Sequence, residues 1–461
     1  MSPLRNRTFR HLFAAQVIAL LGTGLTTVAL ALLAYDLAGS GAGAVLGTAL
    51  ALKMIAYVGI APVVGAFAHR LSRRPLLIGL DVARAGLILL FPFITEVWQI
   101  YVLVFALQAC SAGFTPTFQA TIPDILPDEA QYTRALSLSR LAYDLENLLS
   151  PALAAAALVY LSYSSLFTLN AVSFLASAVL IATVILPAAA PGDRETGFLR
   201  NLTHGFRICL ATPRLRGLLA LNLAIATATA MVIVNTVIYV RDLLGGGESD
   251  TALAFAVSGF GSMLVALALP RLLDRLPERP LMLGGGGLMV LGLGVGLAPA
   301  SAPVLMISWF MIGVGSSCVL TPAGRLLRRS AHPQDRPAVF SAQFALSHAC
   351  WLLAYPLAGW LGSAYGLPAA FLVLGVISAV ATIAAIRLWP AHDPQVVPHT
   401  HAPLDHAHLH VHDEHHQHEH EGWEGPEPHS HPHGHAPMRH AHDYVVDGHH
   451  PSWPLPGAKA D

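Results

Sequence analysis

The sequence is poor in charge and in cysteine. Asp, Glu, Lys and Arg make up only 11% of the 461 residues, whereas 54% are hydrophobic; a soluble globular domain has roughly 25% charged residues. The four cysteines stand singly, so neither a disulfide framework nor a CxxC metal site is readable. No hydrolytic triad, phosphate-binding loop or nucleic-acid-binding patch is apparent. These absences lead us to expect a membrane protein that is not an enzyme and has no nucleic acid partner.

Long apolar stretches recur twelve times between His11 and Trp389. A helix needs about 20 mostly apolar residues to cross the ~30 Å hydrocarbon layer. The first stretch lacks a cleavage signal and is followed by others, so we interpret it as a membrane helix rather than a signal peptide. The predicted spans are 11–36, 44–68, 76–95, 98–120, 134–159, 165–187, 217–240, 251–272, 281–299, 303–324, 338–362 and 367–389.

The order of these spans predicts the organisation of the chain. We expect an all-α integral membrane fold with twelve transmembrane helices in two pseudo-symmetric six-helix halves. The halves are 1–187 and 217–389, joined by a cytoplasmic linker at 188–216 and followed by a tail at 390–461. With the N-terminus inside, 22 of the 26 Lys and Arg residues lie in cytoplasmic segments, in the tail or at the cytoplasmic ends of spans, where such residues accumulate. We therefore expect a multi-pass protein of the inner (cytoplasmic) cell membrane with both termini in the cytoplasm.

The two halves share a basic motif. HRLSRRPL at 69–76 returns as DRLPERPL at 274–281, 205 positions later, and Pro151 and Pro356 are separated by the same offset. This arrangement resembles the major facilitator superfamily, whose pattern after the second helix is Gly-x-x-x-Asp-Arg-x-x-Arg-Arg. The residues at the positions of this pattern are Gly65, His69 (where Asp is expected), Arg70, Arg73 and Arg74 in the first half, and Asp274 and Arg275 in the second. The resemblance implies that they form a conformational gate and that the halves rock about a site near the bilayer midplane.

The fifth predicted span carries three charged residues, Arg140, Asp144 and Glu146. Charged groups in hydrocarbon cost about 2.5–3.5 kcal/mol each on insertion scales, so they usually pair or line a cavity. Arg140 and Asp144 are four residues apart and can pair on one helix face, whereas Glu146 needs another partner. One of the two carboxylates is expected to face the cavity, where alternating protonation and cation binding would suit a proton antiporter. A structural helix-bundling network is the alternative.

The eleventh predicted span contains His348 and Cys350, two residues apart. Imidazole and thiolate both bind borderline-soft divalent cations, so the two side chains are candidate transport ligands. A hydrogen-bonded packing role is the alternative for the histidine.

The segment after Pro390 contains 19 of the 24 histidines, beside several carboxylates and with almost nothing apolar to bury. Such a composition does not fold alone, so we expect a disordered tail. Imidazole binds Ni²⁺, Co²⁺, Zn²⁺ and Cu²⁺, and we predict that the tail binds metal ions. The candidate ligands are His399, His401, His406, His408, His410, His412, His415, His416, His418, His420, His429, His431, His433, His435, His440 and His442.

The core, the IPDILPDE turn at 122–129 and the tail together resemble the histidine-tailed nickel-resistance exporters of the superfamily. The resemblance implies efflux of Ni²⁺, with Co²⁺ as a further candidate, driven by proton antiport and giving metal resistance. No cofactor is required; the expected partners are the lipid bilayer, divalent ions and protons, and we expect a monomer. One alternative is export of an organic solute, a drug or siderophore, with the tail as metal sensor or buffer, although the spans show few clustered aromatics. The other is a membrane-anchored protein that stores metal.

Overall fold

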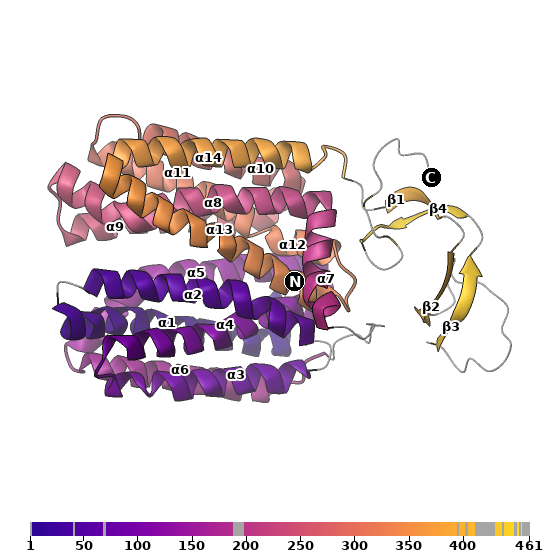
Figure 1. Ribbon diagram of the computed structural model, residues 1–461, viewed down its shortest axis with the longest axis horizontal. Helices are drawn as coiled ribbons and strands as arrows, with labels where there is room; N and C mark the ends of the chain where they lie inside the picture. Colours follow the sequence, from indigo (N-terminus) through magenta and orange to yellow (C-terminus); the bar gives the residue numbers. More distant parts are fainter. Residues whose placement is uncertain are drawn as a thin grey trace.

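The computed structural model describes residues 2–39, 42–67, 71–187, 198–393, 396–401, 404–410, 429–435, 438–446, 450 and 453. Figure 1 shows a bundle of long helices with two pairs of short strands beside one end of it. The N-terminus, the short helices α7 (Phe198–Ala211) and α12 (Ala323–Arg329) and the strands all lie at this end of the bundle (Figure 1). We call it the basic end, because α12 carries Arg325, Arg328 and Arg329 there.

The N-terminal half consists of six long helices. They are α1 (Arg7–Ala38), α2 (Ala42–Phe67), α3 (Arg73–Ile88), α4 (Val97–Ile125), α5 (Glu129–Leu158) and α6 (Tyr163–Ala182), with 3₁₀ turns η1 (Pro3–Arg5) and η3 (Phe91–Phe93). The third predicted span, 76–95, is therefore helical only to Ile88. Pro92 has no backbone N–H to continue the hydrogen-bond ladder, and the chain turns there.

The C-terminal half also consists of six long helices. They are α8 (Pro213–Ile238), α9 (Glu248–Leu273), α10 (Glu278–Val295), α11 (Ala302–Leu320), α13 (Arg336–Tyr365) and α14 (Leu367–Leu388), with a π-helical turn η4 (Tyr239–Leu243) after α8. The predicted linker at 188–216 contains α7, and α8 begins four residues earlier than its predicted span.

The helices of the two halves pack in the same way. In the first half α1 packs on α6, α2 on α4 and α3 on α6; in the second, α8 packs on α14, α9 on α11 and α10 on α14. The halves meet through α2 against α13 and α5 against α9, so the second helix of each half contacts the fifth of the other. This exchange agrees with the pseudo-symmetry expected from the repeated motif.

Ten of the helices in the described residues are long and apolar enough to cross a membrane. The two long helices outside this group are α5 and α10. α5 carries Arg134, Arg140, Asp144 and Glu146, and α10 begins with a charged pair and contains four consecutive glycines, all of which reduce the mean hydropathy. The twelve apolar stretches expected from the sequence are thus twelve long helices, ten of them plain candidates for membrane spans.

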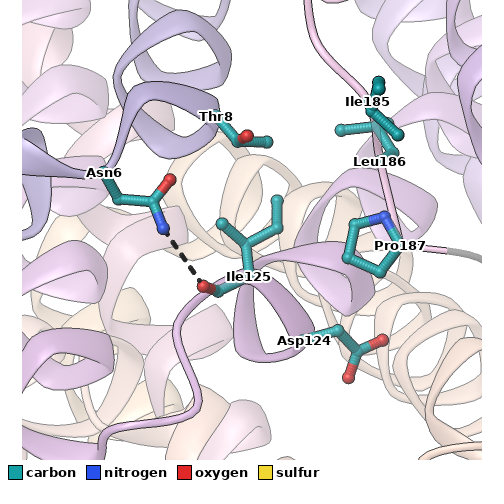
Figure 2. Close-up of a pocket in the computed structure, with 7 residues that line it drawn as sticks. All are labelled: Asn6, Thr8, Asp124, Ile125, Ile185, Leu186 and Pro187. Carbon is teal, nitrogen blue, oxygen red and sulfur yellow. Dashed lines mark hydrogen bonds between the residues drawn. The ribbon is translucent and has the colours of Figure 1, made fainter.

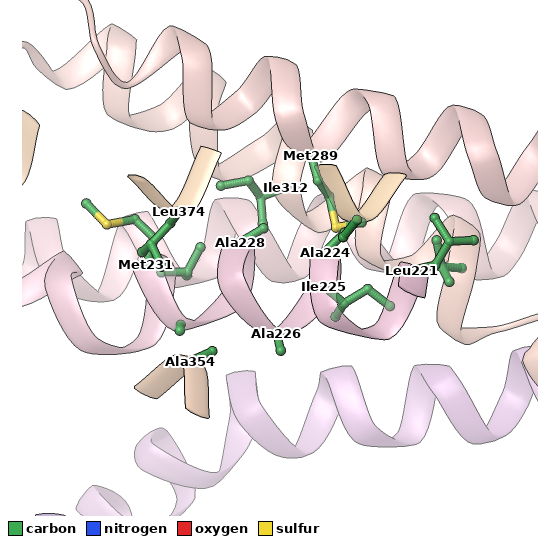
Figure 3. Packing of buried hydrophobic residues seen from close by; sticks show 14 of the residues in the cluster. Leu221, Ala224, Ile225, Ala226, Ala228, Met231, Met289, Ile312, Ala354 and Leu374 are labelled. Atoms are coloured by element: carbon green, nitrogen blue, oxygen red, sulfur yellow. The ribbon is translucent and has the colours of Figure 1, made fainter. Parts of the chain in front are cut away.

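The core of the C-terminal half is built around α8. Figure 3 shows Ala224, Ala228 and Met231 of α8 beside Met289 of α10 and Ile312 of α11, all fully buried. Lipid tails are as apolar as leucine, so helices in a membrane associate through close packing rather than through a hydrophobic driving force. Small residues on α8 allow that close approach from several sides.

The amphipathic helix α7 lies across the basic end and packs against α13 of the second half and α2 of the first. A side chain at Gly205 would lie 2.2 Å from the carbonyl oxygen of Ala338, which explains why glycine is needed at this crossing. The linker therefore rests on both halves where they meet.

The described parts of the tail form two antiparallel ladders. β1 (Val396–His401) pairs with β4 (Met438–Asp443), and β2 (Leu404–His410) pairs with β3 (His429–His435). The sequence led us to expect a disordered tail and did not predict these strands, because ladder formation depends on pairing between residues far apart in the chain rather than on local composition.

Candidate functional site

Aromatic side chains from both halves meet midway along the bundle, between α2 and α13. The ring centroid of Tyr57 on α2 lies 4.9 Å from that of Phe344 and 4.7 Å from that of His348, both on α13. The His348 ring also packs on Phe344 at 4.1 Å and on Trp351 at 5.3 Å. We call Tyr57, Phe344, His348 and Trp351 the aromatic cluster. Phe344, His348 and Trp351 already lie on one face of α13, and Tyr57 of the other half completes the cluster.

Hydrogen bonds fix the polar atoms of this cluster. Tyr57 donates its hydroxyl to Oε1 of Gln108 on α4 at 2.9 Å, and Trp351 donates Nε1–H to Oγ1 of Thr229 on α8 at 3.0 Å. Nδ1 of His348 lies 2.7 Å from the carbonyl oxygen of Phe344. A carbonyl only accepts, so Nδ1 carries the proton and Nε2 keeps a lone pair for another donor or an ion.

Lys53 lies beside the aromatic cluster, and its charge acts on a carboxylate of α5. Nζ of Lys53, one helical turn before Tyr57, is 5.6 Å from the centroid of the Tyr57 ring, a cation–π distance. The charge of Lys53 also acts on the carboxylate of Glu146 on α5. Among the described residues, Glu146 has no hydrogen bond and no ion pair, and it remains available for a proton or a cationic group.

Asp144 is placed differently from Glu146, although the two are neighbours on α5. The predicted pair is confirmed: Nη2 of Arg140 lies 2.9 Å from Oδ1 of Asp144. The hydroxyl of Ser262 on α9 donates to Oδ2 of Asp144 at 2.8 Å and accepts from Arg140. Asp144 is therefore neutralised within a contact between the halves, which leaves Glu146 as the carboxylate of the two that has no ion-pair partner among the described residues.

Cys350 does not join His348. Its thiol lies 3.4 Å from the carbonyl oxygen of Leu346 in its own helix, and the side chain packs against the core of the C-terminal half. Among the residues whose side chains the structure describes, no group of three or more His, Cys, Asp or Glu residues is arranged to hold a metal ion. The pair remains a sequence prediction as a set of transport ligands.

Ion pairs join the halves at the basic end. Asp124, at the end of α4, accepts from Arg73 of α3 at 2.6 Å and from Arg336 of α13. Arg325 of α12 binds Glu129 of α5, and its Nε lies 3.0 Å from Oε1 of Glu278 on α10. These pairs connect helices of both halves, so the basic end is closed in this structure.

The predicted gate motif contributes part of this closure. Arg73 binds Asp124, and Arg74 donates to the carbonyl of Ala182. A Cβ at Gly65 would lie 2.6 Å from that of Ser341 on α13, so the glycine lets the halves touch. His69 and Arg70 lie outside the described residues.

The motif of the second half ends α9. The backbone amides of Asp274 and Arg275 donate to the carbonyls of Pro270 and Leu272. The partners Asp124, Glu129, Arg325 and Arg336 were not among the predicted site residues. The IPDILPDE turn contains two of them, and its acidic residues were the available signal.

A small pocket lies next to this gate, on the N-terminal half (Figure 2). It has a volume of about 360 Å³ and is lined by Asn6, Thr8, Asp124, Ile125, Ile185, Leu186 and Pro187. The amide of Asn6 donates to the carbonyl of Ile125 at 3.4 Å, which ties the start of α1 to the end of α4. The pocket opens beside the Asp124 carboxylate but does not reach the aromatic cluster.

The candidate metal ligands of the tail fall into two groups. The eleven at positions 399, 401, 406, 408, 410, 429, 431, 433, 435, 440 and 442 lie on the four strands. The five at positions 412, 415, 416, 418 and 420 lie outside the described residues. Four cross-strand pairs join two histidines: 399 with 440, 406 with 433, 408 with 431 and 410 with 429.

Comparison with known proteins decides the family. The sequence model described as Major Facilitator Superfamily matches residues 12–245 and 218–426. The chain belongs to the major facilitator superfamily. It is accordingly a multi-pass membrane transporter, embedded in a lipid bilayer.

Two relatives of this superfamily member are similar to it in sequence. The chain is 27% identical over 384 residues to the uncharacterized MFS-type transporter YfiS of Bacillus subtilis (strain 168), covering 79% of this chain and 89% of that protein. It is 25% identical over 209 residues to macrolide efflux protein A of Streptococcus pyogenes, covering 43% of this chain. That second match spans only half the length of the macrolide efflux protein.

Solved structures show the same fold. The human organic anion transporter MFSD10 (TETRAN) aligns with a TM-score of 0.72 at 14% identity, over 84% of this chain and all of that one. A bacterial homologue of the iron transporter ferroportin, in an outward-facing state, aligns with a TM-score of 0.68 at 14% identity, over 83% of this chain and 99% of that one. At such identities the likeness concerns the fold alone.

Proposed function

We propose that this transporter exports an organic, drug-like compound from the cytoplasm in exchange for protons, and that the aromatic cluster is its binding site. The observation that carries the proposal is the meeting of Tyr57 from one half with Phe344 and His348 from the other. Superfamily transporters bind substrate at the interface of their repeats, and here that interface is lined by rings. The sequence match to a macrolide efflux protein supports the same substrate class.

The chemistry of the cluster suits an amphipathic molecule. Aromatic pairs contribute about 0.5–1.5 kcal/mol beyond the area that they bury, so the rings would hold the apolar part of a substrate. The lone pair on Nε2 of His348 can accept a hydrogen bond from its polar part. Lys53 adds a positive charge at the edge of the cluster, and this charge acts on the carboxylate of Glu146.

Glu146 is the proposed site of proton coupling. Its carboxylate, on α5, has no hydrogen-bond or ion-pair partner among the described residues, whereas Asp144 is held by Arg140 and Ser262. A carboxylate without a fixed partner can take up and release a proton as water gains and loses access to it. Closure at the basic end, the proposed cytoplasmic side, would then correspond to the state that releases substrate outward.

Efflux of divalent metal ions is the second candidate. It is favoured by the histidines that the tail ladders place opposite one another, since imidazole binds Ni²⁺, Co²⁺ and Zn²⁺. In the bundle, His348 belongs to no group of three or more described His, Cys, Asp or Glu residues that could hold a metal ion. We therefore propose that the tail binds metal as a sensor or buffer, and rank metal transport through the bundle below export of an organic compound.

Uptake into inside-out vesicles distinguishes the two candidates. Vesicles with an imposed proton gradient would be given a labelled macrolide antibiotic or radioactive Ni²⁺, with intact chain, a chain cut after Pro394, and Tyr57→Ala. Gradient-dependent macrolide uptake that survives the truncation and is lost in Tyr57→Ala supports the proposal. Gradient-dependent Ni²⁺ uptake without macrolide uptake would replace it by metal efflux.

A further inference from the structure

The last described residues of the tail return to the bundle at the place where the tail leaves it. Tyr444, Val445 and Val446 follow β4 directly and are buried, with Tyr444 only 5% exposed. The Tyr444 ring packs edge-on against His450 at 4.6 Å and Trp453 at 5.1 Å. A buried apolar segment needs a surface to pack on, and the neighbouring charged side chains identify that surface.

Arg214, in the first turn of α8, is the centre of this surface. It is only 1% exposed, and its guanidinium lies 4.7 Å from the ring centroid of Trp453, within the range of a cation–π contact. Its Nη2 lies 3.5 Å from the carbonyl oxygen of Tyr444, and its Nε donates to Oγ of Ser330 at 2.8 Å. The planar guanidinium thus contacts the bundle at its edge and the end of the tail on its face.

The same arginine also holds the beginning of the tail. Nη1 of Arg214 lies 3.0 Å from Oδ1 of Asp393, and Nη2 of Arg329 lies 2.7 Å from Oδ2. Nε1 of Trp389 donates to that second oxygen at 3.0 Å. The histidine-rich segment between Asp393 and Tyr444 is therefore fixed at both ends next to one side chain, and Arg329 belongs to α12, the helix whose Arg325 joins the halves.

The two ladders of the tail keep one register. Val396 pairs with Asp443 next to the fixed ends. From there each following residue of β1 and β2 pairs with the preceding residue of β4 and β3, and the same register continues from the first ladder to the second, as far as His410 opposite His429. This register places histidine opposite histidine in the pairs 406 with 433, 408 with 431 and 410 with 429.

We propose that Tyr444, Val445, Val446, His450 and Trp453 form an intramolecular docking segment for Arg214, and that docking sets the register in which the tail histidines pair across the ladders. Fixing the backbone costs conformational entropy for every residue that is ordered, and closing a loop adds to this cost. A docked tail has met part of that cost before an ion arrives. Docking and metal binding then favour each other by the same factor, as linkage requires. The metal half of this inference rests on the tail metal binding proposed above.

Docking is tested first, without metal and without any transport assay. Hydroxyl-radical footprinting of the full chain in lipid nanodiscs would follow oxidation of Tyr444 in the wild type, in Trp453→Ala and in Trp423→Ala, a matched tail tryptophan outside the docking segment. Arg214→Lys keeps the charge and removes the planar face. We expect oxidation of Tyr444 to be about tenfold faster in Trp453→Ala and in Arg214→Lys than in the wild type and Trp423→Ala. Such a factor is within the usual range of coupling between sites. Equal rates in all four proteins would overturn the docking.

The link to metal is tested by calorimetric titration of the same proteins with Ni²⁺. Ni²⁺ should slow the oxidation of Tyr444 in the wild type by some factor, and we expect Trp453→Ala to weaken Ni²⁺ binding by the same factor. The Ni²⁺ affinity of Trp423→Ala should equal that of the wild type. Equal affinities in all variants would overturn the coupling while docking stands. Absence of Ni²⁺ binding in every variant would reject the proposed metal role of the tail and the coupling with it. None of these results depends on what the bundle transports.

Discussion

The two halves touch through charges at the basic end and through rings in the middle of the bundle. At the basic end, Arg73 and Arg336 share Asp124; in the middle, Tyr57 packs on Phe344 and His348. The three charged side chains are at most 15% exposed, and a buried ion pair holds firmly until one partner is removed, which suits a contact that is either made or broken. Rings offer area and hydrogen bonds without a fixed charge, which suits a site that must accept a guest. The difference separates a gate from a binding site.

The largest effect on transport is expected from a change at Glu146, the proposed proton site in the middle of the bundle. Glu146→Gln removes the proposed proton site, so gradient-driven export should fall by more than about tenfold while exchange of substrate across the membrane continues, because a neutral amide cannot cycle a proton. Driven export and exchange would be measured in proteoliposomes. Glu96→Gln, a change of the same chemistry at the exposed start of α4, is the control. If exchange falls as much as driven export, Glu146 supports the structure of the bundle rather than proton coupling.

The gate is broken next, by Asp124→Asn. Removing this carboxylate leaves Arg73 and Arg336 facing each other across the halves without a counter-ion, and breaking a buried pair in this way costs about 3–5 kcal/mol. We expect the basic end to open and export to fall about tenfold. Accessibility of a cysteine at Ser341 to a thiol reagent reports the opening. Asp128→Asn, which keeps the cap of α5, should leave both the export rate and the accessibility of the cysteine unchanged.

The rings are tested by Tyr57→Ala against Tyr57→Phe. Loss of the ring removes contacts with Phe344 and His348, and we expect the KM for the exported compound to rise about tenfold, equivalent to ~1.4 kcal/mol. The phenylalanine variant loses only the hydrogen bond to Gln108 and should change KM by less than about threefold. A change in maximal rate with an unaltered KM would place Tyr57 in the gate and undo the distinction drawn above.

The smallest effect is expected at the rim of the gate. Glu129 pairs with Arg325, but 63% of its side chain is exposed, and Arg325 retains Glu278 and Oγ1 of Thr133. An exposed pair contributes about 0–1 kcal/mol, so Glu129→Gln should change export by less than about twofold. Glu278→Gln, which removes the better buried partner of the same arginine, should reduce export further. A larger loss of export in Glu129→Gln than in Glu278→Gln would show that the exposure of a side chain does not predict the strength of these ion pairs.

The helices could be predicted from the sequence, whereas the contacts between them could not. Apolar length alone marks a membrane helix, and spacing of four predicts a pair within one helix, as Arg140 and Asp144 confirm. Arg73 was a candidate, but its partner Asp124 is 51 positions away, beyond anything that local spacing reports. The spacing of Phe344, His348 and Trp351 on α13 was visible in the sequence, but their contact with Tyr57, about 290 positions away in the other half, was not.

The structure of the tail also depends on residues far apart in the sequence. Its composition led us to expect disorder, since it contains no apolar run long enough to form a core. The register of its ladders begins between two residues that α8 holds, Asp393 and Tyr444, and α8 lies about 180 residues or more before them. A sequence window cannot contain both the strands and the surface on which their ends rest.

The sharing of one carboxylate by two guanidiniums has a kinetic consequence. Asp124 and Arg325 each keep a partner in their own half, so opening must break the two pairs between the halves, Arg336–Asp124 and Arg325–Glu129, in the same movement of rigid helices. The basic end should therefore open by abrupt jumps after long waiting times, rather than by slow widening. In a single-molecule fluorescence recording the transporter would show two well-separated levels, and the waiting time in the closed level would shorten as salt is added.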